Sequence, residues 1–238
     1  MNILITGGSS GLGRCITETA AAAFPEAKIY FSYNSSGESA LEIEKGFSNT
    51  ESLKLDFKDS ASVAAVSEKI AEWDIDVLIN NALPSFIKNH FHKNEAGVFI
   101  QSFSDNISPV LTLTSAFIKS ARSRKRGRII TILSSFVGGM PRLGLSEYTA
   151  NKHYLLSMIK SWAAENVQFN IQSNAVSPEF MDTALNKDLD VRLKEEMIKS
   201  HPLKKLLTPE DAARVVRFLI DAPAHLNGQN IFLDTGKN

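Results

Sequence analysis

Short runs of β-branched and aliphatic residues alternate with longer segments of helical period along this chain of 238 residues. Seven runs have the pattern of strands: Ile3–Thr6, Lys28–Ser32, Ser52–Asp56, Val77–Asn80, Arg128–Leu133, Ile171–Val176 and Asn230–Leu233. Seven segments have the period of helices: Gly11–Ala23, Ser39–Phe47, Ser60–Glu72, Glu95–Ser120, Ser146–Asn166, Thr183–Ser200 and Pro209–Asp221. Parallel strands need crossovers, and helices supply them. The alternation therefore predicts an α/β fold, a doubly wound parallel sheet of seven strands with helices on both faces.

Composition restricts the class of protein further. The chain is 43% hydrophobic and 22% charged, as globular proteins are, and its length suits one domain spanning 1–238. Its 26 basic and 26 acidic residues balance, so we expect neither nucleic acid nor a membrane as a partner. The single Cys15 cannot form an intramolecular disulfide, and no basic leader or spanning apolar run occurs, which favours the cytoplasm.

One charge run stands out against this balance. Arg122, Arg124, Lys125, Arg126 and Arg128 lie at the end of a predicted long helix. Cations there stabilise the negative end of the helix dipole and stay solvated, which is the favoured interpretation; a docking patch for an acidic partner is the alternative. Five His residues include the pair His90 and His92 but no Cys or carboxylate set at ligand spacing, so we expect no metal site.

A glycine-rich turn, Thr6-Gly7-Gly8-Ser9-Ser10-Gly11-Leu12-Gly13, follows the first predicted strand and leads into a helix. Glycine lets the backbone approach a pyrophosphate, and the helix N-terminus offers free N–H groups. The context favours a Rossmann-like dinucleotide site over the alternative, a tight loop without a ligand. Farther along, Tyr148 and Lys152 are four residues apart in a predicted helix, so their side chains project from one face.

These motifs resemble the short-chain dehydrogenase/reductase family, broadly its 3-oxoacyl-[acyl-carrier-protein] reductase-like members. The turn has that family's TGxxxGxG spacing, Asn80-Asn81-Ala82 is similar to its NNAG, and the stretch from Asn174 to Thr183 is similar to its NxxxPGxxxT. Leu83 and Glu179 stand where the family has glycine, so the local backbone could differ. The resemblance covers nearly the whole chain and implies a cofactor-binding set: Gly7, Ser9, Ser10, Gly11, Leu12, Gly13, Asn34, Ser35, Asp56, Phe57, Asn81, Ala82, Tyr148, Lys152, Pro178, Met181 and Thr183.

The resemblance also implies a catalytic tetrad of Asn106, Ser135, Tyr148 and Lys152. A reduced carbonyl needs a proton, and a free tyrosine with a pKa of about 10 is a slow acid near neutrality. We expect Lys152 to lower that pKa, Tyr148 to act as acid or base, and Ser135 to hold the substrate oxygen. Asn106 would hold a water that links Lys152 to solvent, and Ser134 would be structural.

The expected activity is hydride transfer between a nicotinamide dinucleotide and a small-molecule carbonyl or secondary alcohol. The alternative is a dinucleotide-binding regulatory or scaffold protein of the same fold without turnover. The stretch from Phe31 to Ser36 holds no acid that would repel a 2′-phosphate, so NADP(H) is expected to bind more tightly than NAD(H). The substrate itself cannot be read from the sequence.

Two expectations concern larger features of the chain. Leu111, Phe117, Leu155, Ile159 and Trp162 suggest more apolar surface on two long helices than one sheet face can cover, which predicts a homodimer or homotetramer. The charged segment from Ala184 to Ser200 is predicted to be a mobile lid over the substrate.

Overall fold

The computed structural model describes residues 1–181 and 190–238. Its seven parallel strands form one sheet in the order β3-β2-β1-β4-β5-β6-β7. The strands are β1 (Asn2–Ile5), β2 (Lys28–Tyr33), β3 (Thr50–Lys54), β4 (Val77–Asn80), β5 (Gly127–Ile132), β6 (Ile171–Pro178) and β7 (Asn230–Leu233). The helices are α1 (Gly11–Ala23), α2 (Gly37–Gly46), α3 (Ser60–Glu72), α4 (Ala96–Asn106), α5 (Ser108–Arg124), α6 (Ser146–Asn166), α7 (Val191–Ser200) and α8 (Pro209–Asp221). The predicted doubly wound α/β fold is confirmed.

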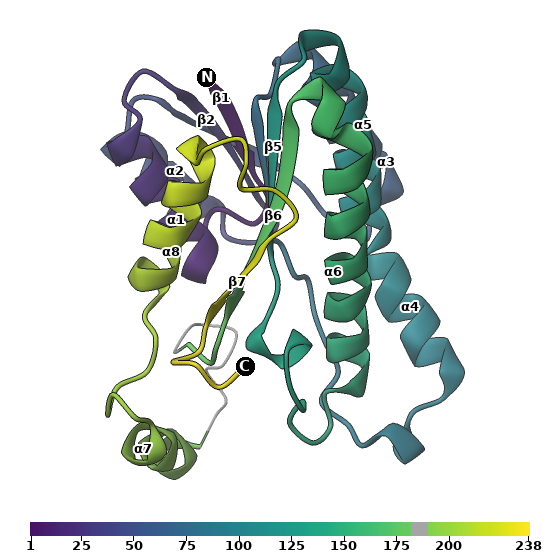
Figure 1. The fold of residues 1–238 in the computed structure, drawn as a ribbon, viewed down its shortest axis with the longest axis vertical. Helices are drawn as coiled ribbons and strands as arrows, with labels where there is room; N and C mark the ends of the chain where they lie inside the picture. Colours follow the sequence, from purple (N-terminus) through teal and green to yellow (C-terminus); the bar gives the residue numbers. More distant parts are fainter. Residues whose placement is uncertain (182–189) are drawn as a thin grey trace.

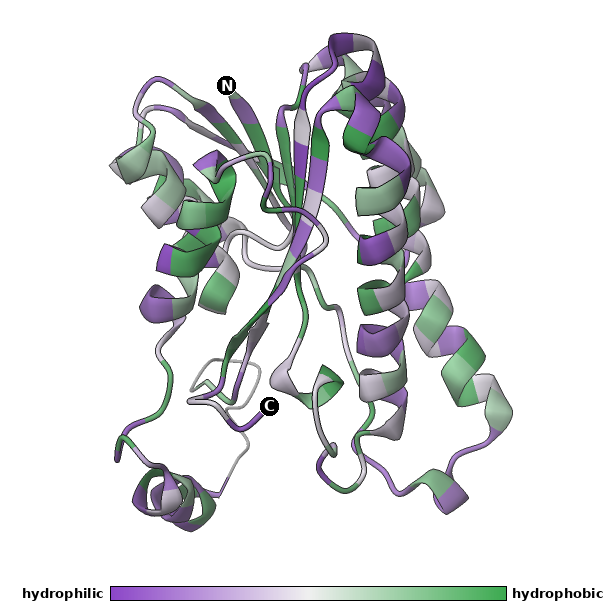
Figure 2. Ribbon diagram, viewed as in Figure 1, coloured by the Kyte–Doolittle hydropathy of each residue, from purple (hydrophilic) through white to green (hydrophobic). Residues whose placement is uncertain are grey.

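Two helical layers cover the sheet (Figure 1). One core cluster joins α1, α2 and α8 to one face, and the other joins α3, α5 and α6 to the opposite face. Every residue of β4 and β6 is buried, as expected of central parallel strands covered on both sides. Hydrophobic and hydrophilic residues occur along both the strands and the helices (Figure 2).

The predicted helix Glu95–Ser120 is wrong in one respect, because it is two helices. α4 ends at Asn106, and α5 begins at Ser108 with Pro109 in its first turn. Proline has no N–H to donate to the preceding turn, and its ring crowds that turn's carbonyl, so the helix is interrupted there. The break leaves Asn106 at the end of α4, beside α6.

The prediction for the third strand is shifted by two residues. β3 pairs with β2 from Thr50, opposite Ile29, to Lys54, opposite Tyr33. Asp56 instead begins a turn, since its carbonyl accepts the Asp59 N–H. The first helical residue of α7 is Val191, after the N-cap Asp190. The predicted helix residues from Thr183 to 189 lie outside the described residues, and so does the first part of the predicted lid, 184–189, whereas its remainder is Asp190 and α7.

The apolar surface expected on the long helices is used within the chain. Phe117, Leu155, Ile159 and Trp162 are all buried in the core cluster between α5, α6 and the sheet, and Leu111 packs against it. The expectation was wrong for these residues because α5 and α6 both lie over the same face of the sheet and turn these side chains into the shared core cluster. They therefore give no support to an interface between subunits.

The basic cluster mostly makes contacts within the chain. Arg124 pairs with Asp74, Arg126 pairs with Asp76, and the Arg122 Nε donates to Asn166 at 2.7 Å. These contacts support the structural interpretation of the cluster. Within residues 1–181 and 190–238, no helix is both long and apolar enough to cross a membrane.

Candidate active site

The strand order reverses between β1 and β4, and a cavity of about 520 Å³ opens there at the carboxyl ends of the strands. Such a switch point is where open α/β sheets bind ligands, and the volume is that of a ligand site. The wall includes these members of the predicted cofactor set: Gly7, Ser9, Ser10, Gly11, Leu12, Gly13, Asn34, Ser35, Phe57, Asn81, Ala82, Tyr148, Lys152, Pro178 and Met181. Thr183 lies outside the described residues.

The glycine turn follows β1 and leads into α1. Gly7 has a φ of +65°, which favours glycine, and a Cβ on Gly13 would lie 1.9 Å from the Gly7 carbonyl oxygen. Ser10 is the N-cap of α1 but makes no side-chain cap, and the first turn holds no acidic residue. The positive end of α1 therefore faces the cavity without compensation, and its N–H groups suit a pyrophosphate.

Thr6 and Asn81 hold this turn against the end of β4. The Thr6 Oγ1 accepts N–H bonds from Asn81 and Ala82 at 3.0 and 3.1 Å. The Asn81 Nδ2 donates to the carbonyl oxygens of Thr6 and Gly7 at 3.0 and 3.1 Å. Leu83, which follows, has no positive φ, so a side chain is accepted there without backbone strain. Sequence reasoning missed Thr6 as the residue that joins the two loops.

The opposite end of the cavity lies beyond β2. Asn34 and Ser35 are exposed on its wall, and the hydroxyls of Ser9 and Ser36 lie 2.7 Å apart. Asp56 does not belong to the wall: its carboxylate accepts the Lys58 N–H at 2.9 Å and caps a turn, although the neighbouring Phe57 does line the cavity.

Tyr148 and Lys152 lie on the first turns of α6, and the Lys152 Nζ is 5.8 Å from the Tyr148 ring centroid. Lys152 is buried, donates to the Ile132 carbonyl oxygen at 2.8 Å, and has its pKa lowered by burial from 10.5 to about 8. Burial also raises the pKa of Tyr148, which a hydrogen bond with Ser134 partly offsets. The pKa of Tyr148 is therefore raised and not lowered as expected, because burial in the free protein disfavours the charged tyrosinate.

Both candidate serines follow β5. Ser134 is buried and N-caps a short 3-10 helix, Ser135–Val137, while the half-buried Ser135 also lines the cavity. Ser134 was predicted to be structural, and its bond with Tyr148 gives it a direct contact with the predicted acid as well. The structure thus brings both hydroxyl groups to the tyrosine end of the cavity.

Asn106 does not line the large cavity but a small one behind Tyr148. Its Nδ2 donates to the carbonyl oxygen and the hydroxyl of Ser102 at 3.0 and 3.1 Å, while its buried Oδ1 has no hydrogen-bond partner among residues 1–181 and 190–238. Asn106, Lys152 and Asn151 border a volume of about 10 Å³, the size of one water molecule.

Sequence reasoning missed a buried carboxylate beside the tyrosine. Glu147 is 2% exposed, and its Oε1 accepts from the hydroxyl of Ser102 and from the Asn151 Nδ2. Its Oε2 accepts the Ile87 N–H at 3.0 Å. Glu147 therefore ties α4 and the loop after β4 to the start of α6. An acid in a helical segment carries no sequence signal of burial, because its partners come from distant segments.

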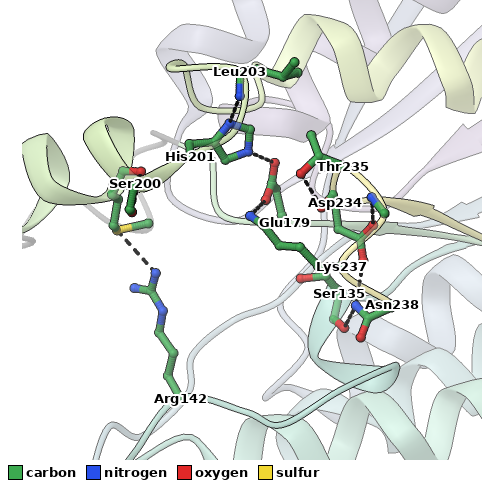
Figure 3. Close-up of polar contacts among 12 residues, drawn as sticks. Ser135, Arg142, Glu179, Ser200, His201, Leu203, Asp234, Thr235, Lys237 and Asn238 are labelled. Carbon is green, nitrogen blue, oxygen red and sulfur yellow. Dashed lines mark hydrogen bonds and ion pairs between the residues drawn. The ribbon is translucent and has the colours of Figure 1, made fainter.

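A second polar cluster closes the cavity next to β6 (Figure 3). Glu179, whose side chain is 11% exposed, accepts from the His201 Nε2 at 2.7 Å and pairs with the Lys237 Nζ at 2.6 Å. The His201 Nδ1 accepts the Leu203 N–H at 3.2 Å, so a neutral ring with its hydrogen on Nε2 satisfies both contacts. Glu179 has no positive φ, so it replaces the family's glycine without strain.

The residues after β7 complete this cluster. The Asn238 Nδ2 donates to the Ser135 carbonyl oxygen at 2.9 Å and to the Asp234 carboxylate at 2.6 Å (Figure 3). Its side chain lies against Gly139 and Gly138, where added Cβ atoms would come within 2.6 and 2.7 Å of it. Nothing in the sequence pattern indicated this contact, which joins the end of β7 to the loop after β5.

A glycine-lined cradle, a half-buried tyrosine and a buried lysine in one cavity define a dinucleotide-dependent oxidoreductase. Residues 7–238 match the family model described as enoyl-(acyl carrier protein) reductase. The 3-oxoacyl-[acyl-carrier-protein] reductase FabG of Escherichia coli (strain K12) is 33% identical, over 98% of this chain and 95% of the relative. The chain belongs to the short-chain dehydrogenase/reductase family.

Solved structures agree with this assignment. A proposed NAD(P)-dependent gluconate 5-dehydrogenase from Beutenbergia cavernae, with NADP bound at low occupancy, is 28% identical with a TM-score of 0.89, covering 99% of this chain and 95% of that one. A proposed gluconate dehydrogenase from Agrobacterium tumefaciens is 25% identical with a TM-score of 0.88, covering 99% and 94%. The protein is thus an NAD(P)-dependent oxidoreductase acting on C=O or CH–OH groups, and the comparisons give the non-enzymatic alternative no support.

Proposed function

We propose that this single-domain protein reduces a ketone with NADPH in the cytoplasm and that the Tyr148 hydroxyl donates the proton. The observation that carries the proposal is the cavity whose wall brings together the glycine turn, Tyr148 and Lys152. Burial raises the pKa of Tyr148, so the phenol, like a free one, is protonated near neutrality. A protonated phenol is the form that carbonyl reduction requires, whereas alcohol oxidation needs the tyrosinate. We therefore propose reduction of the carbonyl as the reaction at neutral pH.

A nicotinamide dinucleotide fits the residues of the cradle and, when bound, supplies the hydride. The first N–H groups of α1, from Gly11 to Gly13, would hold its pyrophosphate. Pro178 and Met181, at the end of β6, line the part of the cavity assigned to the nicotinamide by family resemblance.

The preference for the phosphorylated cofactor rests on the end of β2. Asn34 and Ser35 can donate hydrogen bonds to a 2′-phosphate, and no acid stands there to repel it. NADP in the related crystal structure from Beutenbergia cavernae agrees with this preference. Because no lysine or arginine adds a charge-assisted bond at these positions, the preference is about 1–2 kcal/mol.

Tyr148, Ser135, Ser134 and Lys152 would each have a separate role in delivering the proton. Tyr148 gives its proton to the substrate oxygen, which Ser135 holds in place, and Ser134 bonds to the phenol. Lys152, with a pKa of about 8, exchanges protons readily near neutrality and returns one to the phenol. A water held by the Asn106 Oδ1 in the small cavity would connect Lys152 to solvent.

Turnover tests the proposal directly. Purified protein is incubated with NADPH and a panel of ketones, and loss of reduced-nicotinamide absorbance is followed beside the Tyr148→Phe variant, which keeps the ring and loses only the hydroxyl. Ketone-dependent oxidation by the wild type that Tyr148→Phe lacks is the expected result. A variant that is as active as the wild type would contradict the role of Tyr148.

Fluorescence titration of NADPH and NADH at fixed salt tests the cofactor. We expect the dissociation constant of NADPH to be about tenfold lower, and Asn34→Asp to abolish the difference by repelling the phosphate. An NADH dissociation constant equal to or below that of NADPH in the wild type would overturn the preference.

We further propose that the enzyme is a homo-oligomer, on a surface other than the one the sequence suggested. Ile100 of α4 is 72% exposed, and Tyr154 of α6, 38% exposed, contacts Phe103 edge to face at 5.0 Å between ring centroids. These side chains form an apolar surface across two neighbouring helices, and an isologous contact with a second copy would cover it.

A further inference from the structure

We propose that the substrate carries an anionic group, a carboxylate or a phosphate, and that Lys88 and Arg142 bind this group in the wall of the active-site cavity. The inference deepens the proposed function and rests on it. Both cations line the cavity that also holds Tyr148.

The two cations come from loops that are hydrogen-bonded together. Lys88 lies in the loop after β4, Arg142 lies in the loop before α6, and the Asn89 N–H donates to the Gly144 carbonyl oxygen at 2.9 Å. The Ile87 N–H donates to the buried Glu147, the residue before Tyr148. Both cations are therefore held next to the start of α6, where the phenol lies.

Neither cation has a carboxylate partner among the described residues. The Arg142 Nη2 donates to the Met197 sulfur at 3.3 Å, and its guanidinium lies 5.5 Å from the centroid of the Phe180 ring (Figure 3 shows the sulfur contact). Neither contact neutralises its charge. Lys88 is exposed and makes no ion pair within the described part of the chain. Both side chains keep their full charge for a ligand.

Among the described residues, the wall holds only one carboxylate, Glu179, and both of its oxygens already contact cationic or N–H donor groups of the chain. Its two oxygens are taken by His201 and Lys237, at 2.7 and 2.6 Å, and Lys237 balances its charge (Figure 3). Among the described residues, the cavity wall thus carries a local excess of positive charge, although the net charge of the whole chain is zero. Such a wall attracts anions and raises their local concentration.

Besides the two serines, several large apolar side chains line the cavity that holds the phenol. Phe86 packs on Tyr148 with ring centroids 5.2 Å apart, and Phe136, Leu143 and Phe180 line the same cavity. An uncharged sugar or polyol would find few polar partners among these side chains. The surroundings therefore suit a ketone on a short carbon body that ends in an anionic group.

Matched ketone pairs test the proposal, because the members of each pair differ only in the charged group. Levulinate is compared with methyl levulinate, and dihydroxyacetone phosphate with dihydroxyacetone, so the two pairs separate carboxylate from phosphate. The variants are Lys88→Met and Arg142→Met. Lys160→Met is the matched control, since Lys160 is an exposed cation on α6 outside the cavity.

We expect the wild type to have a higher kcat/KM for the anionic member of one pair. Each cavity variant should reduce that preference at least about tenfold, the loss expected for a charge-assisted hydrogen bond, while Lys160→Met leaves it unchanged. Added salt should raise the KM of the anion in the wild type. No preference for either anion, or cavity variants that match Lys160→Met, would overturn the inference.

Two readouts keep this result separate from the proposed function. If no ketone is reduced, the proposed function fails, and calorimetric titration with levulinate and with inorganic phosphate still decides on the anion site. Binding that weakens in Lys88→Met and Arg142→Met would support the site, and equal binding in all four proteins would overturn it. A rise in the NADPH dissociation constant as large as the change in anion preference would assign the cations to the cofactor and also overturn it.

Discussion

Replacing Lys152 with methionine is expected to make the protein more stable and catalytically inactive. Burial lowers the pKa of Lys152 from 10.5 to about 8, so the charged form is disfavoured in the folded protein. A pKa difference of about 2.5, at about 1.4 kcal/mol per unit, costs the folded state about 3 kcal/mol near pH 7. Methionine removes that cost and has a similar length.

One contact offsets part of the gain. Lys152→Met loses the 2.8 Å bond from the Nζ to the Ile132 carbonyl oxygen, which contributes about 1 kcal/mol. The net effect near pH 7 is therefore a stabilisation of about 2 kcal/mol. The unfolded chain binds more protons than the folded one between pH 8 and 10.5, so the wild type gains stability over this range and the advantage of the variant disappears.

Urea unfolding at about pH 7 and about pH 10.5 measures both effects, with Lys160→Met as a control from the exposed side of α6. The free energy of unfolding of Lys152→Met should exceed that of the wild type at the lower pH and not at the higher. A variant less stable than the wild type near neutrality, with a pH-independent difference, would refute the argument that burial disfavours this charge. Such a trade of stability for activity is common at catalytic sites.

Three further predictions address the acid, the serines and the oligomer. Tyr148→Phe should lower kcat about 10²- to 10⁴-fold while NADPH still binds. Because burial raises the pKa of Tyr148, alcohol oxidation should accelerate as the pH rises from neutrality into the alkaline range, and an oxidation rate that falls over that range would contradict the assignment. Ser135→Ala should lower kcat about 10²-fold. Ser134→Ala should mainly shift the pH profile of oxidation to higher pH, because the hydrogen bond from Ser134 lowers the pKa of Tyr148. The opposite pattern would exchange the roles of the two serines. Light scattering at micromolar concentration should show an oligomer that Ile100→Asp dissociates, and a monomeric wild type would rule out the proposed contact.

Local signals in the sequence were enough for most of the fold. α3 runs from Ser60 to Glu72 as predicted, with the Asp59 side chain accepting the Ala61 N–H at its start, and β4 lies at Val77–Asn80. The turn around Gly7 was recognisable because its conformation requires glycine whatever surrounds it. Elements with their own caps, periods and turn residues can be located without knowing their neighbours.

Features that depend on distant partners could not be located in this way. Trp162 is buried because it lies in the core cluster that α5 and α6 form with the sheet. Glu147 can be buried because the Ser102 hydroxyl and the Ile87 N–H, from distant segments, donate hydrogen bonds to its carboxylate. Pro109 indicates the break between α4 and α5, but the apolar period continues across the break and favours a single helix. The direction of the pKa shift of Tyr148 also depends on how far the phenol is buried, which the sequence does not show.

The position of Asn238 has a practical consequence for making the protein. Its side chain is hydrogen-bonded to the Ser135 carbonyl oxygen and packs on the loop after β5, so a purification tag fused behind it would start beside the candidate catalytic residue Ser135. A tag attached before Met1 would instead precede β1, whose carboxyl end, not its start, meets the cavity. A tag fused after Asn238 is therefore expected to disturb this loop, and kinetic constants measured on such a protein would differ from those of the untagged protein.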